Sequence, residues 1–151
     1  MDVDEEGAAF LRALAQELKL PALQFGNDDS TAFVLDEKLV FELNLERVAQ
    51  EVVIGILFGA VPPDYADVDF LRRLLGANYY WRLTEGGTIG FDQTSGALTL
   101  AFRVRLPMRD PAQIESMIAK LAGAADNWRQ QVAAEGEGVN PAEPGEPMVR
   151  V

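Results

Sequence analysis

Three glycines in the segment GGTIGFDQTSGALTLAFRVRLP, residues 86–107, have a spacing that suggests phosphate chemistry. Gly86, Gly87 and Gly90 could cradle an anion, because glycine lets backbone N–H groups approach it closely. A P-loop or dinucleotide loop, however, follows a strand and opens a helix, and a P-loop also carries Lys followed by Ser or Thr. Here the pattern predicts a helix before the glycines and a strand after them, with no lysine nearby. We therefore interpret the segment as a turn into a strand, and we predict no cofactor.

A cluster of acidic residues invites a calcium site. Asp64, Asp67 and Asp69 are closely spaced, but an EF-hand loop requires Gly at its sixth position and Glu at its twelfth. Counted from Asp64, those positions hold Asp69 and Leu75. Carboxylates in the first turn of a helix stabilise its N-terminus. We therefore predict helix capping here, and no metal.

The chain has no cysteine and no histidine. This composition excludes thiolate nucleophiles, Cys/His zinc sites and histidine-based triads. Ser30, Ser95 and Ser116 all lie outside the G-x-S-x-G context of a hydrolase nucleophile. We therefore predict that the protein is not an enzyme. A small-molecule enzyme that uses carboxylates stays an alternative, and it would need a deep polar pocket with clustered acids.

The charge balance narrows the possible partners. Thirteen basic and 24 acidic residues give a net charge of -11, whereas nucleic acid and anionic lipid both need a basic surface. The acidic start MDVDEEGAAF lacks the features of a secretory signal, and the apolar run at 52–63 is too short to span a bilayer. We predict a cytoplasmic protein with no nucleic-acid or membrane partner.

Hydrophobic periodicity gives the element order. Helices are expected at Asp4–Lys19, at Asp67–Tyr79 and from Asp110 onward, where Asp110 is an N-cap and Pro111 starts the first turn. Before the middle helix, strands are expected at Ala32–Leu35, Lys38–Leu45 and Val52–Phe58. The last of these is nearly all apolar, which is typical of a strand buried on both faces. A helix is the alternative interpretation of this segment. After the middle helix, the segment 86–107 supplies a hairpin.

The expected fold is therefore α+β in the order α-β-β-β-α-β-β-α, a twisted antiparallel sheet with helices packed on it. Residues 1–133 form one domain. Residues 134–151 are acidic and rich in Pro and Gly, so we predict a flexible tail.

The middle helix is apolar on more than one side, through Val68, Phe70, Leu71, Leu74 and Leu75. A short helix of this kind needs two surfaces against which to bury its side chains. It is either a central core helix or a helix at a homodimer interface, with one face on its own sheet and the other on a partner.

Three segments together resemble a known family: FLRRLLGANYY at 70–80, the segment at 86–107, and AADNWRQQV at 124–132. They are similar to class I type III secretion chaperones of the Tir-chaperone (CesT-like) family. The resemblance implies a bacterial cytoplasmic homodimer without enzymatic activity. It would bind the N-terminal chaperone-binding region of a secreted effector and keep it soluble and secretion-competent. A secretion ATPase or a regulator could be a further partner.

The resemblance also implies where the contacts lie. The middle helix is expected at the dimer interface, and the first helix and sheet are expected to offer client patches. Expected dimer residues are Val68, Phe70, Leu71, Leu74, Leu75 and Asn78. Expected client-binding residues are Phe10, Leu14, Phe25, Phe33, Leu35, Phe41 and Leu43. The alternative is a non-secretory adaptor or regulator of the same architecture, similar to the YbjN-like group.

Overall fold

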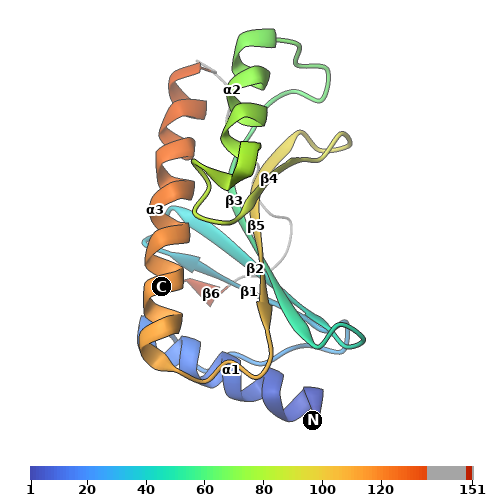
Figure 1. Ribbon diagram of the computed structural model, residues 1–151, viewed down its shortest axis with the longest axis vertical. Helices are drawn as coiled ribbons and strands as arrows, with labels where there is room; N and C mark the ends of the chain where they lie inside the picture. Colours follow the sequence, from blue (N-terminus) through green and yellow to red (C-terminus); the bar gives the residue numbers. More distant parts are fainter. Residues whose placement is uncertain (136–148, 151) are drawn as a thin grey trace.

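The computed structural model describes residues 1–135 and 149–150, and it has the expected α+β architecture (Figure 1). Its elements run in the order α1 (Val3–Leu18), β1 (Ser30–Leu35), β2 (Leu39–Glu46), β3 (Glu51–Ala60), α2 (Val68–Asn78), a 3-10 turn η1 (Tyr79–Trp81), β4 (Thr88–Phe91), β5 (Ala97–Arg105), α3 (Pro111–Glu135) and β6 (Val149–Arg150). The sheet order is β4-β5-β3-β2-β1-β6. The predicted order of three helices and five strands is confirmed, and β6 and η1 are additions to it.

The helices begin where side chains satisfy their first N–H groups. Asp2 caps α1 by accepting from the N–H of Asp4 at 2.9 Å, and Asp67 caps α2 by accepting from that of Phe70 at 3.1 Å. Asp110 accepts from the N–H of Ala112 at 3.0 Å at the start of α3. The predicted N-cap at Asp110 is confirmed.

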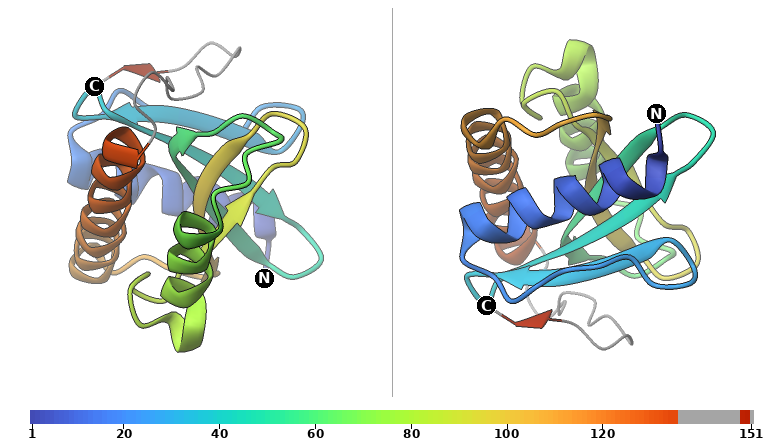
Figure 2. Two further views of the ribbon diagram at one scale, coloured as in Figure 1. Left: turned by 90° about the horizontal axis from the view of Figure 1, so that it is seen from above. Right: turned by 90° about the horizontal axis from the view of Figure 1, so that it is seen from below.

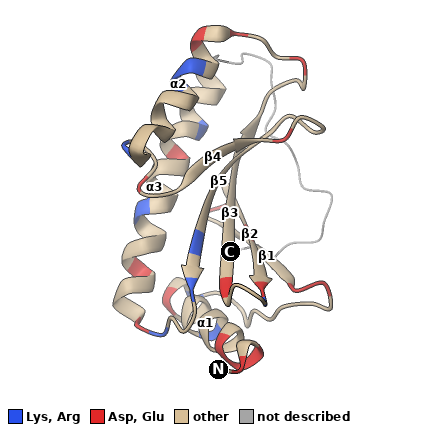
Figure 3. Cartoon of the chain, turned by 45° about the vertical axis from the view of Figure 1, so that its right-hand side comes forward, with Lys and Arg blue, Asp and Glu red and all other residues tan. Residues whose placement is uncertain are grey.

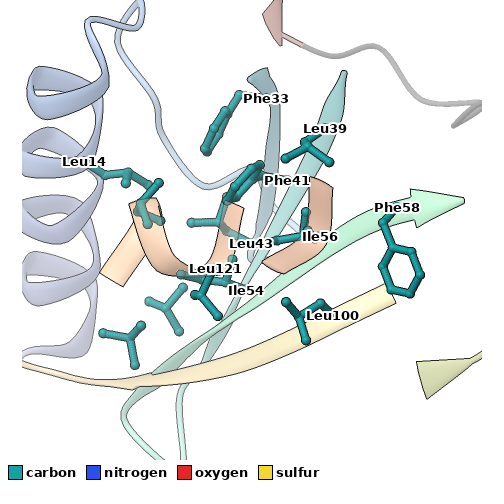
Figure 4. Packing of buried hydrophobic residues seen from close by; sticks show 14 of the residues in the cluster. Leu14, Phe33, Leu39, Phe41, Leu43, Ile54, Ile56, Phe58, Leu100 and Leu121 are labelled. Atoms are coloured by element: carbon teal, nitrogen blue, oxygen red, sulfur yellow. The ribbon is translucent and has the colours of Figure 1, made fainter. Parts of the chain in front are cut away.

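The core lies between one face of the sheet and the helices α1 and α3, which cross beneath it (Figures 1 and 2). Alternation along β2 puts Leu39, Phe41, Leu43 and Leu45 on this buried face, as the sequence predicts. The Phe41 ring stacks on that of Phe33 from the paired strand β1, with 4.8 Å between centroids (Figure 4).

Strand β3 corrects one expectation. The sequence predicts burial on both faces, but only alternate residues such as Ile54 and Ile56 are fully buried. Val53, Gly55 and Leu57 on the opposite face are half-buried. The reason is that α1 and α3 both pack on the same side of the sheet, and no helix of the described residues 1–135 and 149–150 covers the second face (Figure 2).

The glycine-rich segment forms the predicted hairpin of β4 and β5. Gly96 has φ 80°, and a Cβ at this position would lie 1.8 Å from the carbonyl oxygen of Val61. Only glycine fits that turn. Its role is therefore to close a hairpin against the chain that leaves β3.

The predicted tail falls mostly outside the described residues. Its first two residues complete α3, and Val149 and Arg150 form β6 beside β1. Residues 136–148 and 151 lie outside the described residues, so the predicted flexibility of the tail is untested there.

We predict that Phe41→Ala lowers the free energy of unfolding by about 3–5 kcal/mol, because it removes a fully buried ring and leaves a cavity. Urea denaturation followed by circular dichroism measures this loss. Glu42→Ala, exposed on the opposite face of the same strand, is the control and should change the value by less than about 0.5 kcal/mol. Equal losses in the two variants would contradict the assignment of the core face.

Candidate functional site

Helix α2 buries one side and exposes the other. Phe70 and Leu74 face the core of their own chain, whereas Val68 and Leu75 are 59% and 71% exposed. Leu71 lies between these sides and is half-buried. The described part of the chain therefore covers one side of this helix and leaves apolar side chains exposed on the other.

The exposed apolar side of α2 continues into η1 and the residues after it. Tyr79, Tyr80, Trp81 and Leu83 are all more than half exposed, and the two tyrosine rings meet edge to face at 4.7 Å. We call the set Val68, Leu75, Tyr79, Tyr80, Trp81 and Leu83 the α2–η1 surface. Exposed large apolar side chains gathered on one part of a protein are a feature of interaction sites.

The backbone itself turns these aromatic side chains outward. Tyr80 and Trp81 have φ values of 52° and 55°, in the left-handed region that non-glycine residues rarely adopt. Such strain persists where the surrounding structure imposes it, often at functional positions. The expected dimer residues do not include Tyr79, Tyr80 or Trp81. The signal available in the sequence was three consecutive aromatic residues beside a helix that was already apolar on two sides.

Asn78, expected at the dimer interface, makes both of its side-chain hydrogen bonds within the chain. Its amide nitrogen donates to the carbonyl of Ile89 at 3.0 Å, and its amide oxygen accepts from the N–H of Ile89 at 2.8 Å. Asn78 therefore joins the end of α2 to strand β4. It holds the α2–η1 surface in place, and any contact with a second chain stays a prediction.

The expected client-binding residues divide into two groups. Five are fully buried in the core: Phe10, Leu14, Phe33, Phe41 and Leu43. A client could reach these only after a rearrangement of α1 or the sheet. Phe25 and Leu35 are half-buried. The client-binding role of all seven stays a prediction, and the structure leaves only these two accessible.

Helix α1 is held across the sheet by ion pairs at its acidic end. Arg47, in the β2–β3 turn, donates from Nη2 to Asp4 at 2.8 Å and from Nε to Asp29 at 2.7 Å. The bond from Arg47 holds the pKa of the Asp29 carboxyl below its usual value. Arg109 pairs with Glu6 on the same helix. These exposed pairs add little stability each, but they fix where the helix begins relative to β1.

A groove of about 720 Å³ runs between α2 and α3. Small residues such as Gly76 and Gly123 line it, and the indole N–H of Trp128 donates to the carbonyl of Leu83 at 3.4 Å. Basic residues of α2 and α3 lie along it (Figure 3), and Glu85 is the single carboxylate among the described residues that line it. A pair of carboxylates suited to acid–base catalysis is therefore missing from this groove.

Within residues 1–135 and 149–150, no group of three or more acidic side chains is placed to hold a metal ion. Asp67 caps α2 instead. Over the same residues, no helix has both the length and the apolar character to cross a membrane.

The model of the Tir chaperone protein (CesT) family matches residues 9–129. Among solved structures, the ExsC-ExsE complex aligns with a TM-score of 0.71 at 21% identity, over 86% of this chain and 96% of the matched chain. The HopA1-SchA chaperone-effector complex aligns with a TM-score of 0.69 at 16% identity, over 84% of this chain and 95% of the matched chain. The Yersinia pestis type III secretion chaperone SycH, in complex with a fragment of YscM2, aligns with a TM-score of 0.61 at 18% identity. The alignment covers 80% of this chain and 97% of the matched chain. No functionally curated protein matches the sequence.

We predict that Asn78→Ala destabilises the chain by about 1–3 kcal/mol, because it leaves both backbone groups of Ile89 without these partners. Hydrogen–deuterium exchange should show faster exchange in β4. Asn44→Ala, at an exposed position of β2, is the matched control and should leave both quantities unchanged. Unaltered β4 protection in Asn78→Ala would show that the helix is held in some other way.

Proposed function

Because this chain belongs to the Tir chaperone protein (CesT) family, we propose that it is a type III secretion chaperone. It binds the N-terminal segment of a secreted effector and keeps that segment soluble and competent for secretion. The observation that carries this proposal is the family match over residues 9–129, which extends from α1 into α3. A chaperone–effector complex and a type III secretion chaperone among the structures with the same fold support it.

The physical features of the chain suit protein binding. Edge strands can accept an added strand, and half-buried apolar side chains can anchor alternate residues of an extended client. Phe25 and Leu35 are the accessible members of the expected client set, and Leu35 ends the strand β1. We propose that a client contacts these two residues. No cofactor or catalytic residue enters the proposal.

We further propose that the protein is a homodimer assembled through the α2–η1 surface. A two-fold interface uses the same patch on both copies, so an apolar ridge on one helix can cover its own equivalent. Of the expected dimer residues, Val68 and Leu75 belong to this surface, and the half-buried Leu71 lies between it and the core side. Phe70 and Leu74 support the helix from the core side. We expect the dimer in the bacterial cytoplasm, with a secretion ATPase or a regulator as further partners.

Affinity purification from the native bacterium tests the function directly. The expected result is a stable complex with one secreted effector, retained when the effector is cut down to its N-terminal region and lost when that region is deleted. Recovery of only non-secreted partners would instead favour an adaptor or regulator of the same architecture.

A pair of adjacent leucines tests the dimer. We predict that Leu75→Asp, on the exposed side of α2, gives a folded monomer, because a buried unpaired charge costs several kcal/mol in the interface. Leu74→Asp, on the core side, should unfold or aggregate. Size-exclusion chromatography with light scattering measures the mass, and Val48→Asp, at a fully exposed position, is the control. A normal dimer from Leu75→Asp would remove this surface from the interface.

Leu35→Lys tests the client surface. We predict about tenfold weaker binding of the effector's N-terminal segment, because a charge replaces an apolar anchor worth roughly 1.5–3 kcal/mol when buried. Isothermal titration calorimetry measures the affinity, and the melting temperature should stay within a few degrees of that of the unmodified protein. Val48→Lys is the matched control. Unchanged affinity in Leu35→Lys would place the client elsewhere.

A further inference from the structure

Strand β6 comes from the segment whose composition predicts a tail. Val149 pairs with Phe33 and Arg150 with Val34, in parallel, whereas the other strand pairs of the described sheet are antiparallel. The family match ends at residue 129, and the three neighbours named above cover 80–86% of this chain but 95–97% of their own. The strand therefore lies beyond the matched residues and occupies one edge of the sheet (Figure 1).

We propose that the outer edge of β1 is a strand-accepting site that β6 of the same chain occupies, so that a client strand must displace β6 to bind there. This inference rests on the proposed chaperone function for the identity of the competitor. The pairing of β6 with β1 of the same chain does not depend on the proposed function.

The β1 edge has the properties that strand addition requires. An edge strand presents N–H and C=O groups that any extended segment can bond, whatever its side chains. Phe33 and Val34 are both buried, although they point to opposite faces of the sheet. A strand added beside them therefore meets apolar surface on each face, which suits an extended client with apolar residues on both sides.

The cis strand is also weakly held, as a replaceable occupant must be. It forms two residue pairs, and parallel pairing is slightly less stable per residue than antiparallel pairing. Its occupancy comes largely from the covalent connection to β1, because a segment of the same chain binds at an effective concentration of about 1 mM. If the free segment bound with a Kd of about 100 µM, the tethered one would weaken a competing strand by about tenfold.

The test replaces both paired residues by proline. Proline lacks the N–H that a ladder needs, so Val149→Pro/Arg150→Pro should release the β1 edge. Ala142→Pro/Glu143→Pro adds two prolines outside the pair and is the matched control. The probe is a fluorescent peptide with the sequence of residues 140–151, NPAEPGEPMVRV, titrated into each variant by anisotropy.

We expect faster amide exchange in Ser30–Leu35 of Val149→Pro/Arg150→Pro, and about tenfold tighter peptide binding than in the unmodified chain and the control. The same peptide with prolines at both positions should not bind. Equal peptide affinity for all three proteins, or unchanged β1 exchange, would overturn the proposal.

A second arm separates this inference from the proposed function. The effector segment recovered by affinity purification should bind Val149→Pro/Arg150→Pro about tenfold more tightly than the unmodified chain. If the prolines change peptide binding but no effector is found, the result supports the pairing of β6 with β1 and contradicts the chaperone function. If every variant binds the effector with the same affinity, the result supports the chaperone function and contradicts the competition between β6 and the client strand.

Discussion

Strand β3 is paired along almost its whole length by β2 on one side and β5 on the other, and the other elements are placed relative to it. Its alternate residues, among them Ile54 and Ile56, are fully buried on the face that α1 and α3 cover. Each such side chain contributes roughly 1.5–3 kcal/mol on burial. The long helix α3 approaches closely enough that a Cβ on Gly59 would lie 3.0 Å from the Val132 side chain. One covered face thus provides most of the core.

Using a single face has consequences for the rest of the chain. Helices α1 and α3 cover the inner side of the sheet, and α2 lies beside β4 (Figure 2). Within the described residues, α2 is covered along one side. Its outer side and the aromatic turn after it remain exposed. The sheet edges face the same problem, because an open sheet leaves backbone groups unpaired along both of its edges. The surface proposed for a second copy is therefore one that the described part of a single chain leaves exposed, and β6 of the same chain pairs with only two residues of the edge proposed for a client.

Local rules explain why much of this architecture could be predicted. Periodicity located the helices and strands, and capping chemistry located Asp110. The division between core and surface could not be predicted in the same way. Leu74 and Leu75 are the same residue in adjacent positions, yet one is buried and the other exposed. The difference depends on which side of the helix meets the sheet, and neither composition nor spacing contains that information. The five buried residues of the expected client set illustrate the same limit.

Strand β6 was missed for a different reason. Its pairing with β1 uses backbone groups, which every residue carries, so hydrophobic patterning gives no signal for it. The same property makes the β1 edge suitable for exchange. Cooperative stability is greatest where a strand is paired on both sides and covered by helices, and it falls toward edges with few buried contacts. A strand at the edge can therefore leave or be replaced while β3 and its neighbours stay folded. A protein that must release an extended client without unfolding needs this property.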